Sequence, residues 1–391
     1  MTQVTLKSGK SRPVVSGHPW VFSGAIAKVE KPGDDFVEVL DDEGRSLGFG
    51  LLSEHSDIRI RMAPSLSAPL GVAEFAASIT AALNRRMTLG LGDDDHNAFR
   101  LVNSEGDGLP GLIVDHLGKV LTVQITTAPM FRRLHTIVEA LQQVFPDHQV
   151  LRIPPPEFVA TKERFSIEFG WEGTPGPDEV TVREGAVRFL IPTDRMQKTG
   201  HYADMRIHRE WVSRISRGKR VLDAYSYSGG FGLHAAAGGA SEVVCVDSSA
   251  DACEAVRRNA ELNGFGVQTQ QSKVDDFLRS SFDRGSRFDI VILDPPKLAP
   301  SKKHVTGALR LYESLAIQAV RIIEEGILCV GSCSEAIGLY ELERVMANVQ
   351  ARTDRRMSTI YVGTQSPDHP YPTSMPEGRY LTFLAVQVSP A

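Results

Sequence analysis

Two short stretches at the ends of predicted strands carry the side chains best suited to covalent chemistry. Residues 288–293 read FDIVIL and lead into Asp294-Pro295-Pro296-Lys297, where two prolines make a stiff turn that holds the Asp294 carboxylate in place. Residues 326–331 lead into Ser332-Cys333-Ser334. A cysteine thiolate is a nucleophile that can form a covalent intermediate, although a free thiol with a pKa of about 8.5 is only a few per cent ionised at pH 7. A structural acid at Asp294 and a small buried residue at Cys333 are the alternative roles.

A glycine-rich turn, residues 224–232 (AYSYSGGFG), follows a predicted strand at 220–223 and precedes a helix. Its glycines let the backbone approach a ligand at the helix N-terminus, and it lacks the GxGxxG spacing that holds a pyrophosphate. The next strand ends in Asp247, whose carboxylate can accept two ribose hydroxyls; capping the helix at 250–263 is its alternative role. Asp275 and Asp276 open a later helix, where an adenine amino group would arrive. The predicted cofactor contacts are Asp223, Tyr225, Ser226, Ser228, Gly229, Gly230, Asp247, Asp275, Asp276 and Asp294.

Basic residues gather beside these motifs in a chain of 391 residues whose net charge is −5. That charge argues against a protein that coats nucleic acid nonspecifically, but it allows a local basic face. Residues 194–220 include eight basic and three acidic residues, and residues 297–310 include four basic residues and no acidic one. Ordinary solvated helix faces are the alternative. The residues predicted to contact a nucleic acid are Lys198, Arg206, Lys297, Lys302, Lys303 and Arg310.

The cysteine pattern and the hydropathy predict a cytoplasmic protein. All four cysteines fall in the second half of the chain, with no CxxC pair and no histidine at zinc-ligand spacing, so neither a disulfide framework nor a metal site is expected. No apolar run reaches the roughly 18–20 residues that a membrane-spanning helix needs, and the polar N-terminus is not a secretory signal.

The secondary-structure pattern predicts three domains. Residues 1–68 read as short strands separated by turns, and residues 72–191 as a smaller mixture of helices and strands that ends in a hairpin. From residue 192 to 391 strands and helices alternate, which is typical of a parallel sheet covered on both faces. The fold class expected is therefore α/β, with a Rossmann-like C-terminal sheet preceded by a β-rich domain and a small α+β domain.

These motifs together resemble the RlmI-type cytosine-5 methyltransferases of large-subunit ribosomal RNA. The resemblance rests on Asp294-Pro295-Pro296-Lys297, Ser332-Cys333-Ser334 and the glycine-rich turn, and it extends to residues 17–22, 103–111 and 197–200. It implies an N-terminal RNA-binding PUA domain and S-adenosylmethionine (SAM) as the cofactor. It also implies that Cys333 adds to C6 of a cytosine while Asp294 hydrogen-bonds N3 and the exocyclic amine, which requires a protonated carboxyl. Large-subunit (23S) ribosomal RNA is the partner expected, and a homodimer is left open.

Three residues depart from the family pattern. Many RNA cytosine-5 methyltransferases carry a second cysteine just before the two prolines, but this chain has Leu293, so the base that takes the C5 proton is unassigned; water and Lys297 are the candidates. Leu298 and His201 stand where an aromatic residue is usual.

Three other functions compete with cytosine methylation. A SAM-dependent enzyme that methylates a guanine in ribosomal RNA would need no nucleophilic cysteine. A non-catalytic RNA-binding module is disfavoured by the intact set of Asp247, Asp294 and Cys333. A dehydrogenase is disfavoured because GxGxxG is missing from the glycine-rich turn.

Overall fold

The chain folds into two compact units, and the computed structural model describes residues 2–30, 33–63, 70–194, 196 and 199–391 of it. Unit 1 comprises Met1–Val182, Ile191–Ala203 and Pro367–Gly378. Unit 2 comprises Arg183–Leu190, Asp204–Ser366 and Arg379–Ala391. The division into domains at 1–68, 72–191 and 192–391 stays a prediction.

The first sheet of unit 1 has six strands in the order β2-β6-β5-β4-β1-β3. Alternating apolar side chains build its core, which contains Val4, Val37 and Ile60 among others. The sequence predicts strands at 3–6, 20–22, 36–40 and 58–62, and all four are confirmed within one residue; the structure adds β3 and β5. The strands are β1 (Thr2–Leu6), β2 (Trp20–Phe22), β3 (Ile26–Glu30), β4 (Phe36–Leu40), β5 (Ser46–Leu52) and β6 (Ile58–Met62), with a short helix α1 (Arg12–Val15) after β1.

The second sheet of unit 1 has the order β11-β10-β9-β8-β7. The sequence also predicts a strand at 165–169, and this prediction is wrong. Phe165 and Ile167 are buried in the core, as the alternation indicates, but the segment pairs with no neighbouring strand. The elements are α2 (Val72–Thr88), β7 (Ala98–Asn103), β8 (Leu112–Leu117), β9 (Val120–Ile125), α3 (Ala128–Phe131), α4 (Leu134–Val144), β10 (Gln149–Ile153), α5 (Glu157–Glu163) and β11 (Gly170–Trp171). A separate hairpin, β12 (Glu179–Glu184) and β13 (Val187–Pro192), follows as expected.

Unit 2 is built on a seven-stranded sheet in the order β16-β15-β14-β17-β18-β20-β19. The strands β16, β15, β14, β17 and β18 are parallel, and β20 joins β18 antiparallel. The strands are β14 (Arg220–Ala224), β15 (Glu242–Asp247), β16 (Gln268–Gln271), β17 (Ile290–Leu293), β18 (Gly326–Ser332), β19 (Arg355–Gly363) and β20 (Thr382–Pro390). The expected α/β class and its parallel C-terminal sheet are confirmed.

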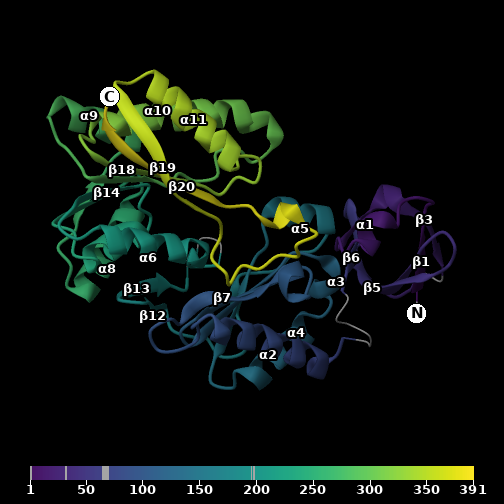
Figure 1. Cartoon of the computed structure of the whole chain (residues 1–391). Helices are drawn as coiled ribbons and strands as arrows, with labels where there is room; N and C mark the ends of the chain where they lie inside the picture. Colours follow the sequence, from purple (N-terminus) through teal and green to yellow (C-terminus); the bar gives the residue numbers. More distant parts are fainter. Residues whose placement is uncertain (1, 31–32, 64–69, 195, 197–198) are drawn as a thin grey trace. The chain divides into compact units, whose positions relative to one another are not determined.

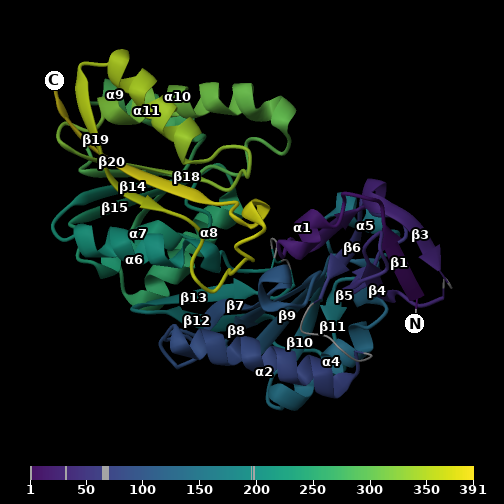
Figure 2. The same cartoon turned by 45° about the vertical axis from the view of Figure 1, so that its right-hand side comes forward.

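Helices cover both faces of this sheet, as Figures 1 and 2 show. One core packs α9, α10 and α11 against the sheet, and another packs α6, α7 and α8 against the opposite face. The helices are α6 (Arg206–Ile215), α7 (Gly230–Ala237), α8 (Ala250–Asn263), α9 (Val274–Asp283), α10 (Val305–Arg321) and α11 (Leu339–Ala351). Because α7, α8, α9 and α10 each lead from one parallel strand to the next, the carboxyl ends of these strands gather at one edge, where open α/β sheets bind ligands.

Strand register brings the three predicted motifs to that edge. Ala224 of β14 pairs with Leu293 of β17, which pairs with Val330 of β18. The glycine-rich turn, Asp294 and the end of β18 therefore begin at the same level of the sheet.

Candidate active site

The turn after β14 holds two tyrosines in a backbone conformation that non-glycine residues rarely adopt. Tyr225 and Tyr227 have φ angles of 65° and 48°, a left-handed conformation that costs about 1–3 kcal/mol each. Neighbouring groups hold it in place: the backbone N–H groups of Tyr225 and Ser226 both donate to the Val246 carbonyl, at 2.9 and 3.1 Å. The turn is thus pre-shaped by β15, and strain of this kind is typical of ligand sites.

Asp247 orders the turn with both of its carboxylate oxygens. Oδ2 accepts the Tyr227 N–H at 3.0 Å, and Oδ1 accepts the Ser249 N–H at 2.9 Å. Ser249, not Asp247, is the N-cap of α8, since its side chain accepts from the Ala252 N–H at 3.2 Å. Each carboxylate oxygen has a further lone pair, so the half-buried Asp247 can also accept ribose hydroxyls.

Asp223 lies beneath the turn rather than on its surface. It is 1% exposed, and its Oδ2 accepts the Gly232 N–H of α7 at 2.8 Å. Burial, and next to it the charge of Asp247, raise the pKa of Asp223 to about 7, against the opposing effects of the Gly232 N–H and Arg209. From this position Asp223 orients the start of α7.

The acids that open α9 differ in their surroundings. Asp275 is half-buried and accepts hydrogen bonds from Gln318 and Arg279, whereas Asp276 is exposed. Burial raises the pKa of the Tyr225 phenol, and the charges of Asp275 and Asp247 raise it further. Tyr225, Asp247 and Asp275 therefore lie near one another around the turn, and that they bind a nucleoside stays a prediction.

Asp294 packs directly onto the backbone of β18. A Cβ atom at Gly331 would lie 2.4 Å from Asp294 Oδ1, so only glycine leaves room for the carboxylate. The Asp294 N–H donates to the Ala224 carbonyl at 3.4 Å, which continues the pairing of β17 with β14. The carboxylate is therefore fixed between the cofactor turn and the strand that carries Cys333.

Cys333 differs from the other three cysteines in its exposure. Cys245, Cys253 and Cys329 are buried, and Cys333 is half-buried just beyond the end of β18. Burial raises the pKa of the Cys329 thiol far above its ordinary value, as expected for a residue of the core. None of the four cysteines, all of which lie among the described residues, forms a disulfide.

Tyr312 is a site residue that the sequence did not reveal. It lies on α10, is 1% exposed, and its hydroxyl donates to the Gly331 carbonyl at 3.0 Å. Burial raises its phenol pKa, and the charges of Asp294 and Cys333 raise it further, so all three groups lie near one another. A lone tyrosine in an apolar helix gives no signal of this role, because its partner is nineteen residues away on a strand.

The predicted nucleic-acid contacts separate by exposure. Lys297, Lys302, Lys303 and Arg310 are exposed, on and before α10. Arg206 is 4% exposed, so it is buried and not on the surface where the sequence predicted it. Lys198 lies outside the described residues.

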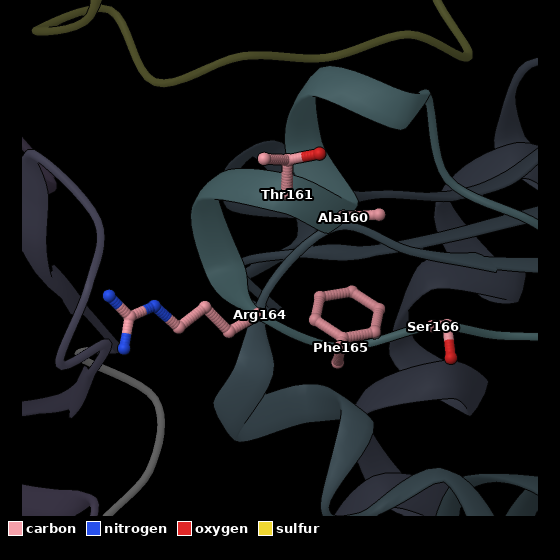
Figure 3. Close-up of a pocket in the computed structure, with 5 residues that line it drawn as sticks. All are labelled: Ala160, Thr161, Arg164, Phe165 and Ser166. Carbon is pink, nitrogen blue, oxygen red and sulfur yellow. The ribbon is translucent and has the colours of Figure 1, made fainter.

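The described residues include neither a candidate metal site nor a candidate membrane-spanning helix. No cluster of three or more His, Cys, Asp or Glu side chains that could hold a metal ion occurs among them. Within the same part of the chain, no helix is long and apolar enough to cross a membrane. A surface hollow of about 410 Å³ lies in unit 1, lined by residues around the end of α5, and contains none of the predicted site residues (Figure 3).

Comparisons with known proteins now decide the family. A model of the S-adenosylmethionine-dependent methyltransferase family matches residues 101–338, and a PUA-like domain model matches residues 4–63. The chain is 32% identical to Ribosomal RNA large subunit methyltransferase I of Erwinia tasmaniensis over 395 residues, which cover 99% of each chain. The same protein of Escherichia coli is 32% identical over 398 residues, again 99% of each chain. The chain belongs to the ribosomal RNA large subunit methyltransferase I family.

Solved structures show the same fold as this family member. The methyltransferase SMU.776, complexed with SAH, has a TM-score of 0.84 and 19% identity, and the match covers 99% of this chain and 100% of that one. A SAM-dependent methyltransferase from Streptococcus mutans has a TM-score of 0.81 and 18% identity, with the same coverage.

The residues of the turn fit the SAM that this family uses. Ser226 Oγ is buried without a hydrogen-bond partner among the described residues, which is costly unless a ligand supplies one. The first N–H groups of α7 have no partner one turn earlier in the helix and can face a ligand there. A polar, pre-shaped turn beside Asp247 and Asp275 is thus suited to a nucleoside with a charged amino-acid tail.

Proposed function

We propose that this chain transfers the methyl group of SAM to C5 of a cytosine in large-subunit ribosomal RNA, through a covalent bond between Cys333 and C6. One observation carries the proposal: the half-buried thiol and the carboxylate belong to the same small region. Cys333 is the only one of the four cysteines that is not buried, and it lies two residues after Gly331. The Asp294 carboxylate packs against Gly331.

The chemistry requires a nucleophile because C5 of cytosine is otherwise unreactive toward a methyl donor. The Cys333 thiolate adds to C6 and moves electron density onto C5. The cofactor supplies an electrophilic methyl group, which C5 takes. Loss of the C5 proton then restores the ring double bond and expels the thiolate. Forming and breaking one covalent bond in this way divides a difficult step into easier ones.

Asp294 holds the ring during this sequence. Its protonated carboxyl donates to N3 and its other oxygen accepts from the exocyclic amine, so charge that builds on the ring is stabilised as Cys333 adds. Tyr312 supports the arrangement by binding the Gly331 carbonyl between the two groups.

RNA reaches the site as a flipped or looped-out cytosine, since C5, C6 and the Watson–Crick edge must all be presented together. Phosphates of the RNA contact four exposed basic side chains, Lys297, Lys302, Lys303 and Arg310. The PUA-like domain supplies further RNA contacts. Each neutralised phosphate releases counterions, so affinity should fall steeply between low and moderate salt. An affinity that does not change with salt would contradict these contacts.

The test is to map 5-methylcytosine in unmodified ribosomal RNA after incubation with labelled SAM. Cys333→Ala should lose at least about a thousand-fold of the activity. Cys329→Ala is the matched control, because it removes a thiol from the same strand but from the core, and it should stay active. Label on a guanine, or full activity of Cys333→Ala, would favour the guanine methyltransferase instead.

The cellular setting belongs to the same proposal. Four cysteines that form no disulfide among the described residues suit a reducing cytoplasm, where ribosomal RNA is modified. A homodimer stays a prediction, which light scattering of the purified chain would test.

A further inference from the structure

Two asparagines on α8 bind the same neighbouring strand, but only one of them also reaches the cofactor turn. Asn259 is fully buried; its Oδ1 accepts the Leu190 N–H of β13 at 2.8 Å, and its Nδ2 donates to the Ser228 carbonyl at 3.1 Å. Asn263, one helical turn later, binds the Arg188 N–H and carbonyl at 2.8 and 2.7 Å, and also donates to the Asn259 carbonyl.

The end of the turn is held from a second direction as well. The His234 Nδ1–H donates to the Gly230 carbonyl at 2.8 Å. Its other ring nitrogen lies 3.4 Å from Glu184, which also lies 3.0 Å from Arg209. Glu184 and Leu190 both belong to the segment 183–190, so this one segment supports Ser228 through Asn259 and Gly230 through His234.

The support matters because the backbone of the turn is strained and needs neighbouring groups to keep its conformation. Tyr225 and Tyr227 sit in a costly conformation, and the φ of 85° at Gly229 adds a third left-handed residue. If such a strained turn relaxed to other conformations, a ligand that selects one of them would bind more weakly. A buried donor that fixes the Ser228 carbonyl disfavours those other conformations.

We propose that Asn259 is a positioning residue for SAM: it ties the Ser228 carbonyl of the cofactor turn to strand β13 and so pre-forms the binding conformation. The proposal rests on SAM binding, a property of the family, and is independent of which base is methylated.

The test measures SAM and SAH affinity by calorimetry, without RNA, for the full chain. Asn259→Ala should raise both dissociation constants about ten-fold. Asn259→Asp keeps the oxygen that accepts from the Leu190 N–H but puts a second carboxylate oxygen in place of the donor to Ser228. At pH 8 it should therefore also raise both dissociation constants about ten-fold. The matched control is Asn263→Ala. It removes three side-chain hydrogen bonds, compared with two for Asn259→Ala, but none of the three reaches the turn, so SAM affinity should change less than two-fold.

A merely structural role predicts a different pattern. Melting temperature would then fall for both asparagines, and SAM affinity would follow melting temperature rather than the contact with Ser228. Turnover at saturating SAM should stay within about two-fold of wild type for Asn259→Asp, with the change confined to the KM for SAM. If Asn259→Ala does not fold, Asn259→Asp decides. Wild-type SAM affinity in a folded Asn259 variant, or an equal loss in Asn263→Ala, would overturn the proposal. Because no RNA is present, this outcome is separate from that of the Cys333 test.

Discussion

Unit 1 and unit 2 each bury an aspartate completely, and the two carboxylates have opposite surroundings. Asp107 in unit 1 is bound by Arg86 through two bonds of 2.6 and 2.7 Å, by Arg85 at 2.7 Å and by the Asn103 N–H at 2.6 Å. Asp223 in unit 2 accepts a hydrogen bond from the Gly232 N–H, and burial raises its pKa to about 7. A fully paired charge is typical of a structural site, whereas a perturbed carboxyl beneath a strained turn is typical of a functional one. A substitution at Asp107 should therefore appear as lost stability, and substitutions around the sheet edge of unit 2 as lost function.

The largest effect is expected from Asp107→Asn. Arg86 is 1% exposed, so the substitution leaves a buried cation without its partner and should lower the free energy of unfolding by about 3–5 kcal/mol. Denaturant unfolding measures this, with the exposed Asp94→Asn as the control, for which less than about 0.5 kcal/mol is expected. Activity per folded molecule should not change. A stability like that of wild type would remove the contrast between the units.

Gly331→Ala should show the reverse pattern. The new Cβ would collide with Asp294 Oδ1 and displace the carboxylate, so activity should fall by about a hundred-fold, and by far more than SAM affinity does. Steady-state kinetics and calorimetry on the same preparation separate the two. Unchanged activity would mean that the position of Asp294 does not matter to the reaction.

Asp223→Asn should change how stability depends on pH. In the unfolded chain Asp223 has its ordinary pKa of 3.8, whereas in the folded chain the pKa is about 7. Between these values the folded protein binds more protons, so this group's contribution to stability is present below pH 4 and is lost as pH rises through 7. Asn cannot titrate, so the variant should lack this decline, which amounts to about 4 kcal/mol at roughly 1.4 kcal/mol for each pKa unit. Parallel wild-type and variant curves from pH 4 to 8 would show that the group does not titrate in this window.

Gly307→Ala should have the smallest effect and serves as the control for Gly331. A Cβ at this position of α10 meets nothing within 4 Å, so alanine should stabilise the helix by about 0.5–1 kcal/mol and leave activity unchanged. A thermal melt with an activity assay checks both parts. A loss of activity here would show that any change near α10 disturbs the site.

Local patterns predicted the parts of the site that follow directly from strand ends. The turn after β14, the acid after β15 and the Asp-Pro-Pro turn all stand where a strand stops, and α8 has the bounds that its sequence indicated. Asn259, Tyr312 and Gly331 could not be found this way, because each acts through a partner at least nineteen residues away. The strand expected at 165–169 failed for a related reason: alternation shows which side chains are buried, but pairing depends on a neighbour elsewhere in the chain.

The central claim is a covalent bond between Cys333 and a cytosine ring, and trapping that bond tests it most directly. Ribosomal RNA that contains 5-fluorocytosine can take the methyl group but cannot lose a proton from C5, so the adduct should persist. Wild type and Cys329→Ala incubated with SAM should give a protein–RNA band that survives denaturation, with the RNA attached to the peptide that contains Cys333. Cys333→Ala should give none. Methylation of the fluorinated RNA without any cross-link, or a cross-link that survives in Cys333→Ala, would contradict the account.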